Sequence, residues 1–508
     1  MSSAVAAARV GVLSRPGPAV AAIAVLALVL SCIGLANRGL GLDELLSANF
    51  AAHGPWATLV TVLRFGVHPP LYYLQLSLWM LVGQGDGWLM ANSMLWHAAA
   101  VMLLAHAAGR LYGPRIGLAA ALLLAVSPAA LLYADQVRMY TFVMFLAVWA
   151  WYAQARWIEG TSGRLGAFWM ILAQVAVTAS HTAGLLMLSG IVVFGGIGVL
   201  ATRRRYLILR WLLAEGVVLV LSLPAIGIGM LRGVSHLRTP CLQDIVAVWK
   251  FLAGGGGFVQ FAPQFALLAG PLLGAVVLLA LLAGMLRDRR LVLPILTLVF
   301  VPLLLAALAS HLAKPLWIER IFVPVIPFLC LCLARAALGG ALSRQAGRAT
   351  VLALVLLWGG ITVAGQTARA KGDGYQPAAD AVRLAARPGD LVLVDGDFAY
   401  WCFLWSLAGP DWGDPRQAYI LNADWDRLMR KLPEPMLGLL DLGEDSRRLR
   451  ALGVSVALWD RREAPPTATG DILLLRPQST TAIALPDRRL GETQVFAPLL
   501  LERWTAQP

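Results

Sequence analysis

Several short polar segments interrupt the long apolar runs of this sequence. Asp43 and Glu44 form an acidic pair, and a carboxylate can take up a proton. Arg138 and Arg320 each adjoin an apolar run, where the planar fork of an arginine could hold an anion. Histidines such as His68 can donate a hydrogen bond or bind a metal ion. The segments are Asp43-Glu44, His68–Tyr73, Tyr133–Tyr140, Ser180–Thr182 and His311–Arg320.

The elements that position these segments follow from composition. Of 508 residues, 59% are hydrophobic and only 14% are charged, against about a quarter charged in an ordinary soluble domain. The deficit lies between Ala19 and Gly365, and charged residues reach ordinary density after Lys371. We therefore expect a membrane-spanning domain over residues 1–366 and a soluble domain over residues 367–508.

Apolar runs predict about eleven spans, since a span needs about 20 apolar residues. The first run follows Arg9 and Arg15 and has no clear cleavage site, so we interpret it as a span rather than a signal peptide. The predicted spans are Pro18–Asn37, Asn92–Ala108, Ile116–Ala134, Met139–Ala155, Gly166–Ser180, Thr182–Leu200, Trp211–Met230, Gln264–Leu286, Leu291–Ser310, Ile321–Ala334 and Thr350–Gly365.

Basic clusters predict the orientation of these spans. They fall in every second connection, which is typical of cytoplasmic loops. We therefore expect a cytoplasmic N-terminus and an extracytoplasmic C-terminal domain. The same distribution explains the net charge of +13 without nucleic acid as a partner. The clusters are Arg110/Arg115, Arg156/Arg164, Arg203–Arg205/Arg210, Arg287/Arg289/Arg290 and Arg335/Arg344/Arg348.

The first outer loop, residues 38–91, contains an apolar stretch that is too short to be a span. Leu71–Gly83 has about 13 residues, and counting it as a span would move every later basic cluster to the outside. We therefore expect a juxtamembrane or re-entrant helix there.

All the polar segments lie on the outer side under this topology. Each alone has an ordinary explanation, such as a helix cap at Asp43 or a snorkelling side chain at Arg138. Ionisable groups at membrane depth are costly and usually functional, however, and their gathering on one side indicates a pocket.

The order of the motifs resembles the bacterial branch of the dolichyl-phosphate-mannose–protein mannosyltransferase-like family, glycosyltransferase family 39-like proteins of the GT-C fold. The resemblance rests on the acidic pair, His68-Pro-Pro-Leu71, the turn Tyr133-Ala-Asp-Gln-Val-Arg-Met-Tyr140, Ser180-His-Thr182 and Arg320. Two positions depart from the family pattern. Gln136 stands where the family commonly has Glu, and Ile321 follows Arg320 in place of Tyr.

The resemblance implies transfer of a sugar from a polyprenyl phosphate, with inversion, to a lipid, glycan or protein acceptor on the outer side of the bilayer. Asp43 would be the base, with Glu44 orienting a neighbour or the substrate, and Arg138 would hold the donor phosphate. A divalent metal at the two histidines of the motifs is an open alternative. The other substrate-binding side chains would be His68, Tyr72, Tyr133, Tyr140, His181, Lys314 and Arg320.

The outer domain has mixed helix and strand signals, so we expect an α/β fold. A helix is predicted over Pro377–Ala386, and strands over Leu391–Val394, Val454–Trp459 and Ile472–Leu475. We interpret this domain as one that selects or positions the acceptor.

Two other functions compete with transfer. One is a transporter or flippase of lipid-linked glycan, although no internal repeat of the kind many transporters carry is visible. The other is a non-catalytic scaffold, which the departures at Gln136 and Ile321 would suit.

Overall fold

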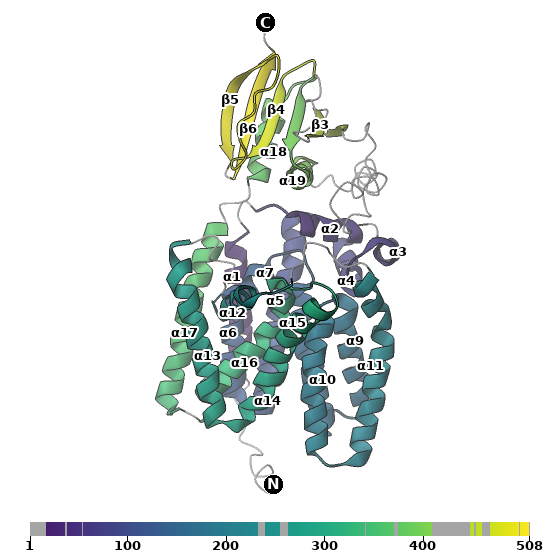
Figure 1. The fold of residues 1–508 in the computed structure, drawn as a ribbon, viewed down its shortest axis with the longest axis vertical. Helices are drawn as coiled ribbons and strands as arrows, with labels where there is room; N and C mark the ends of the chain where they lie inside the picture. Colours follow the sequence, from purple (N-terminus) through teal and green to yellow (C-terminus); the bar gives the residue numbers. More distant parts are fainter. Residues whose placement is uncertain are drawn as a thin grey trace.

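The computed structural model describes residues 17–35, 38–52, 54–231, 239–254, 263–340, 342–369, 374–408, 448–451, 454–459, 468–496 and 498–506. A bundle of helices carries a small sheet domain at one end (Figure 1). This confirms a helical polytopic protein with a C-terminal α/β domain. The long or membrane-level helices are α1 (Gly17–Ile33), α5 (Asp86–Tyr112), α6 (Pro114–Val126), α7 (Pro128–Ala134), α8 (Tyr140–Ile158), α9 (Gly166–Ser180), α10 (Gly184–Ala201), α11 (Arg205–Leu231), α12 (Leu242–Gly254), α13 (Pro263–Arg287), α14 (Val292–Pro294), α15 (Val301–Leu312), α16 (Ile326–Leu338) and α17 (Arg344–Arg369).

Each predicted span coincides with a helix or a pair of helices, but the count of eleven is not confirmed. Within the described ranges, seven helices are long and apolar enough to cross a membrane, or eight if the bent pair α6–α7 is one span. Helices α1 and α9 are apolar but shorter. Short turns, 3-10 turns and a π-helix interrupt several apolar runs, as in η3 (Arg289–Leu291), η4 (Ile295–Phe300) and η5 (Glu319–Val325).

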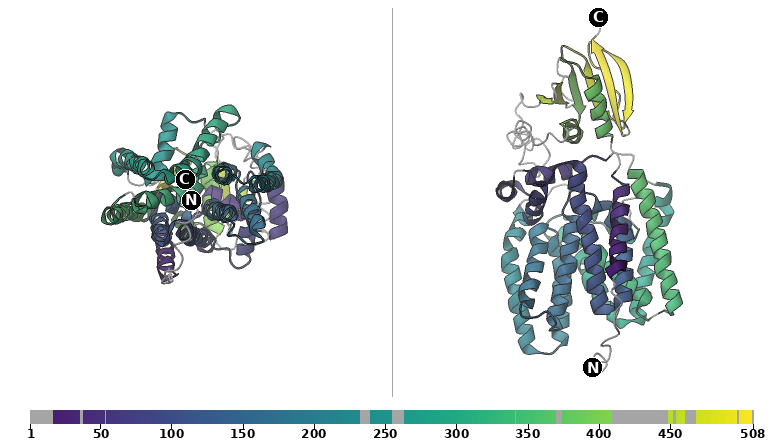
Figure 2. Two further views of the ribbon diagram at one scale, coloured as in Figure 1. Left: turned by 90° about the horizontal axis from the view of Figure 1, so that it is seen from below. Right: turned by 180° about the vertical axis from the view of Figure 1, so that it is seen from behind.

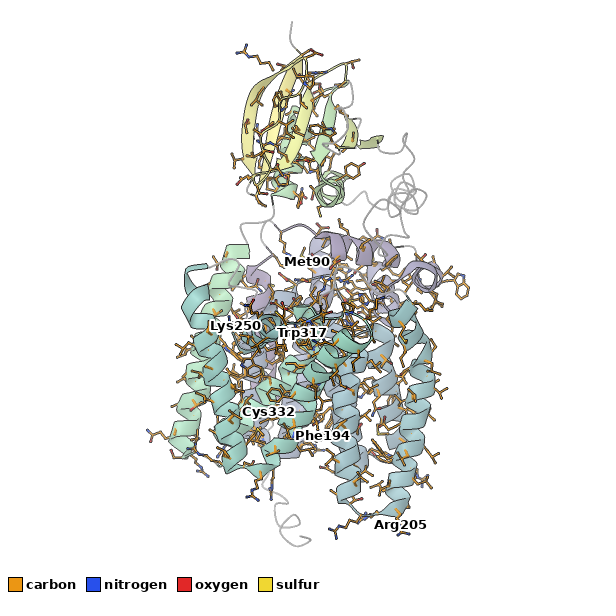
Figure 3. The ribbon with its side chains drawn as sticks, in the orientation of Figure 1. Met90, Phe194, Arg205, Lys250, Trp317 and Cys332 are labelled. Carbon is orange, nitrogen blue, oxygen red and sulfur yellow. The ribbon has the colours of Figure 1, made fainter. Side chains whose placement is uncertain are left out.

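The two ends of the bundle differ in composition. Arg205 lies at the end remote from the sheet domain, whereas Trp317 lies near the domain (Figure 3). The short helices α2 (Leu42–Ala51), α3 (Pro55–Phe65) and α4 (Leu71–Met80) lie at the domain end (Figure 1). Ten residues of α4 extend only about 15 Å, too short to span a bilayer. Arg9 and Arg15, which precede the first predicted span, lie outside the described residues.

The predicted span Ile116–Ala134 is broken into α6 and α7, and this break shapes the site. Pro128 lacks an N–H group and Ser127 caps the new helix through its side chain, so α6 ends and α7 starts at an angle of 59°. Helix α7 is then followed by the turn Asp135–Met139, from which α8 starts. The crossing of α6 and α5 is close because Gly117 has no Cβ; one would lie 2.4 Å from the backbone oxygen of Ala105.

The C-terminal domain contains a six-stranded sheet in the order β2-β3-β1-β4-β6-β5. Strand β1 pairs in parallel with β3 and β4, and the outer pairs are antiparallel. The three predicted strands are confirmed, and the predicted helix is α18 (Tyr375–Ala385). Figure 2 shows this domain above the bundle from behind. The strands are β1 (Leu391–Asp395), β2 (Arg448–Ala451), β3 (Val454–Trp459), β4 (Ile472–Pro477), β5 (Arg488–Phe496) and β6 (Leu499–Ala506), and α19 (Asp397–Ala408) follows β1.

Candidate active site

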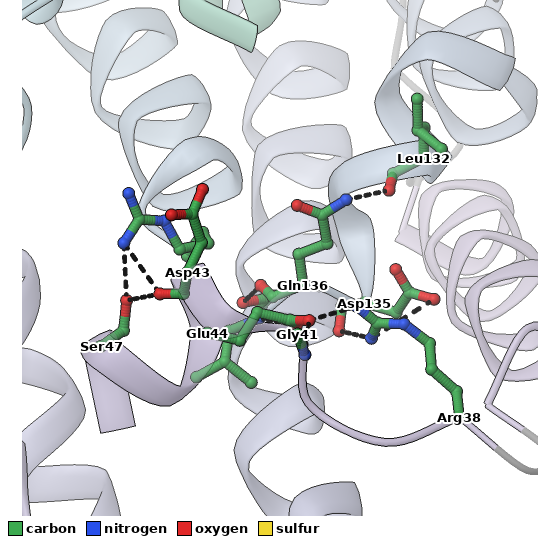
Figure 4. Close-up of polar contacts among 11 residues, drawn as sticks. Arg38, Gly41, Asp43, Glu44, Ser47, Leu132, Asp135 and Gln136 are labelled. Atoms are coloured by element: carbon green, nitrogen blue, oxygen red, sulfur yellow. Dashed lines mark hydrogen bonds and ion pairs between the residues drawn. The ribbon is translucent and has the colours of Figure 1, made fainter. Parts of the chain in front are cut away.

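The acidic pair lies in the first turn of α2, where the two carboxylates have different surroundings. Glu44 is only 4% exposed. Its Oε2 accepts hydrogen bonds from Arg38 Nη2 at 2.6 Å and from the Gly41 N–H at 2.9 Å, and its Oε1 accepts from the Val137 N–H at 2.8 Å (Figure 4). Glu44 therefore ties the start of α2 to the turn Asp135–Met139.

Arg38 is part of this network around Glu44, although none of the sequence motifs indicated it. Its Nη1 donates to the backbone oxygen of Asp135 at 2.9 Å and lies 3.9 Å from Oδ2 of the same residue. The sequence offered only a weak signal, because Arg38 is one of two arginines, with Arg64, in a sparsely basic outer loop.

Arg138 lies behind α2 and is 5% exposed. Its Nη1 donates to the backbone oxygen of Asp43 at 3.0 Å and to Oγ of Ser47 at 3.0 Å. Ser47 in turn donates to the same backbone oxygen of Asp43. The guanidinium group is thereby attached to the first turn of α2, close to the carboxylate that the sequence singled out.

Asp43 points the other way and forms an ion pair with Arg320, from η5. Oδ2 of Asp43 lies 2.6 Å from Nη1 of Arg320, and 277 residues separate them in the chain. The two side chains are 30% and 29% exposed, so the pair is accessible to a substrate. A charge-assisted contact of this length fixes the direction of the carboxylate.

Arg320 also lines a cavity of about 310 Å³. Most of its lining is apolar, with residues from α10, α11 and α15 such as Leu185, Ile226 and Ala309, and a smaller part is polar. The cavity therefore has the two surfaces that a molecule with a charged head and an apolar tail requires. Its polar lining includes His68, Tyr140, Thr178, His181, Thr182, Lys314 and Arg320.

The two histidines of the motifs meet in this cavity. Their rings stack with centroids 4.5 Å apart, Nδ1 of His68 lies 3.1 Å from Oγ1 of Thr182, and Nδ1 of His181 accepts from the Ala183 N–H. The accepting Nδ1 leaves the proton of neutral His181 on Nε2. Burial, and then the charges of Arg138 and other nearby arginines, lower the pKa of His181 to about 3. Burial and its neighbours also hold the pKa of His68 well below its usual value.

The tyrosines are divided between the cavity and the core. Tyr140 lines the cavity, and the ring of Tyr133 contacts it edge-on at 4.9 Å. Tyr72 is fully buried and packs against Tyr73 and Phe142, away from the cavity lining. Tyr72 therefore supports the position of α4 rather than the cavity wall.

A metal site is not built by these residues. Within the described ranges, no group of three or more His, Cys, Asp or Glu side chains is placed to hold a metal ion. His68 and His181 stack face to face, an arrangement that does not direct their nitrogens at one point.

These features define a polytopic membrane protein with a GT-C-like fold. No protein-family model matches the sequence, and no curated protein matches it. Among solved structures, the chain is similar to ArnT from Cupriavidus metallidurans in the apo state, with a TM-score of 0.51, 16% identity, and coverage of 78% of this chain and 86% of ArnT. ArnT bound to undecaprenyl phosphate gives a TM-score of 0.50 at the same identity and coverage. At this identity the likeness establishes the fold.

Proposed function

We propose that this protein is a membrane glycosyltransferase that moves a sugar from a polyprenyl-phosphate donor to an acceptor. The observation that carries the proposal is the ion pair between Asp43 and Arg320, because Arg320 extends from the carboxylate to a cavity whose lining is mainly apolar with a smaller polar, cationic part. The fold supports it, since ArnT of the same fold was crystallised with undecaprenyl phosphate.

The cavity suits the donor. Arg320 and Lys314 are the cationic side chains of its lining, and they would hold the phosphate. Neutral His181 would offer its Nε2–H as a hydrogen-bond donor, and the apolar wall would receive the first isoprene units. This assignment places Arg320 and Lys314 at the phosphate, with the charge of Arg138 behind Asp43.

Asp43 would act as the base. As the acceptor hydroxyl attacks the anomeric carbon of the donor sugar, its proton passes to the Asp43 carboxylate. The bond between that carbon and the phosphate oxygen breaks, and the electron pair stays on the departing lipid phosphate. Fixed cations in a site of low dielectric constant stabilise the charge that develops there. Arg138 and Glu44 would hold α2 so that Asp43 meets the acceptor.

The proposal includes the location. The arginine-rich end of the bundle would face the cytoplasm of a bacterial cell, and the C-terminal domain and the site would face outward. The acceptor would be a lipid, a glycan or a protein that reaches the site from that side.

Purified protein in liposomes tests the proposal. Transfer of labelled sugar from polyprenyl phosphate to a panel of acceptors should be lost in Asp43→Asn. It should persist in Asp288→Asn, whose ion pair with Arg335 stands beside the Arg287/Arg289/Arg290 cluster. Translocation of the donor without transfer of its sugar would support a flippase instead. Undiminished transfer in Asp43→Asn would contradict the assignment of Asp43 as the base.

A further inference from the structure

Helix α19 of the C-terminal domain is apolar on all sides. Its sequence, Asp-Phe-Ala-Tyr-Trp-Cys-Phe-Leu-Trp-Ser-Leu-Ala, has no polar stripe. A helix of this kind must be covered on more than one side. Tyr400, Phe403 and Leu407 are fully or almost fully buried.

Neighbours from both parts of the protein cover α19. Within the C-terminal domain it packs most extensively against α18 and also against β1, β2 and β3, and from the bundle it packs against α2. Phe403, Val392 of β1 and Leu45 of α2 therefore belong to one continuous buried core. The opposite face of the sheet has a separate core, which includes Leu393 and Leu474.

Leu45 of α2, which lies in this core, points away from the proposed base. Successive helical residues are rotated by about 100°, so Leu45 points about 200° from Asp43. Leu45 is nevertheless only 6% exposed, and Leu46 and Ala48 are buried as well. Helix α2 is thus held by Arg138 through its backbone and Ser47, and is covered elsewhere by neighbours that include α19.

We propose that α19 positions the base: it holds α2 from outside the bundle, so that Asp43 stays at Arg320, and Phe403 is a positioning residue for transfer. This inference rests on the proposed function. The described lining of the cavity contains no residue of the C-terminal domain. A loosened α19 should therefore slow turnover while leaving the binding of the lipid phosphate intact. The domain would serve the reaction mechanically, whichever acceptor it meets.

The test uses full-length protein in liposomes and measures kcat and the binding of undecaprenyl phosphate separately. Phe403→Ala should lower kcat, since a misplacement of about 1 Å can cost on the order of 10²-fold, and should leave binding unchanged. Phe403→Leu should restore part of kcat. Leu45→Ala, from the α2 side of the same core, should reproduce the effect.

The matched control is Leu474→Ala, a fully buried residue of the core on the other face of the sheet. It should weaken the domain yet leave kcat and binding unchanged. Three results would each overturn the inference. The first is an equal loss of kcat in Phe403→Ala and Leu474→Ala, and the second is an unchanged kcat in both Phe403→Ala and Leu45→Ala. The third is loss of lipid binding in Phe403→Ala. Asp43→Asn in the same assay separates the two proposals, because its full activity would refute the assigned base whatever Phe403→Ala does.

Discussion

The ion pair between Asp43 and Arg320 allows a quantitative test of whether the two groups act as one unit. The perturbation is a double-mutant cycle of Asp43→Asn, Arg320→Ala and the combined variant. The first removes the base and keeps the shape of the side chain. The second removes the contact at 2.6 Å and the cation on the cavity wall.

The expected sizes follow from the roles. Loss of a general base costs about 10²–10⁴ in rate, and loss of one electrostatic donor about 10²–10³. Independent groups would give the product of the two losses in the double variant. Because Arg320 touches the carboxylate itself, part of its effect requires Asp43, and we expect the double variant to be at least about tenfold more active than the product. That corresponds to a coupling of about 1.4 kcal/mol or more. The pair is partly exposed, so its contribution to folding should be only about 0–1 kcal/mol.

The assay is single-turnover transfer at saturating donor, with thermal unfolding of each variant as a check on folding. The ion pair of Asp288 and Arg335, which lies outside the cavity lining, provides a control cycle in which no variant should lose activity. A coupling energy below about 0.5 kcal/mol, the range expected of independent sites, would refute the idea that Arg320 orients the base.

Three further predictions concern the surroundings of the site. Glu44→Gln should lower the free energy of unfolding by about 3 kcal/mol, because it takes the nearest carboxylate from the largely buried Arg38 guanidinium and leaves only that of Asp135, at 3.9 Å. Denaturation in detergent would measure this. His181→Gln should flatten the pH dependence of stability between pH 6.5 and about 3. In that window His181 takes up a proton in the unfolded protein, whereas in the folded protein, with its pKa near 3, it stays neutral. His181 should therefore lower the free energy of unfolding of the wild type by about 1.4 kcal/mol per pH unit as the pH falls. Melting curves of the two proteins at several pH values would compare this slope. Gly117→Ala should lower the melting temperature, since its Cβ would meet the backbone of α5, whereas Gly216→Ala, with open space around it, should not.

The membrane fold was largely predictable because the period and length of apolar runs report burial in lipid directly. Each predicted span coincides with helices, and the short stretch at Leu71 is a short helix. The number of spans was less predictable, since Pro128 bends one predicted span into α6 and α7, and α1 and α9 are apolar but short. The hydrophobic pattern of β1 was sufficient because a parallel central strand is buried on both faces.

The contacts within the site could not be predicted from sequence. The motifs gathered His68 and His181 on one side of the membrane, but only the packing of the chain shows that their rings stack. Sequence alone could not say which arginine meets the Asp43 carboxylate. Both Arg138 and Arg320 suit the task chemically, and the choice depends on the register of α2 against η5 over a separation of 277 residues. Arg38 was missed because its contacts with Glu44 and with the backbone oxygen of Asp135 depend on how the loop folds against α7, which residue types alone do not show.

The direction of the helices adds a property that a count of charged side chains does not show. Helices α2, α8 and α10 and the helical stretch Glu319–Leu338 all begin at this site, at Leu42, Tyr140, Gly184 and Glu319. Each helix start carries a partial positive charge of about half a unit from its aligned peptide dipoles. The backbone itself thus makes this end of the bundle attractive to an anion. No side-chain substitution removes that field, so a variant without Arg320 and Lys314 should still bind a lipid phosphate more tightly than the corresponding neutral lipid alcohol.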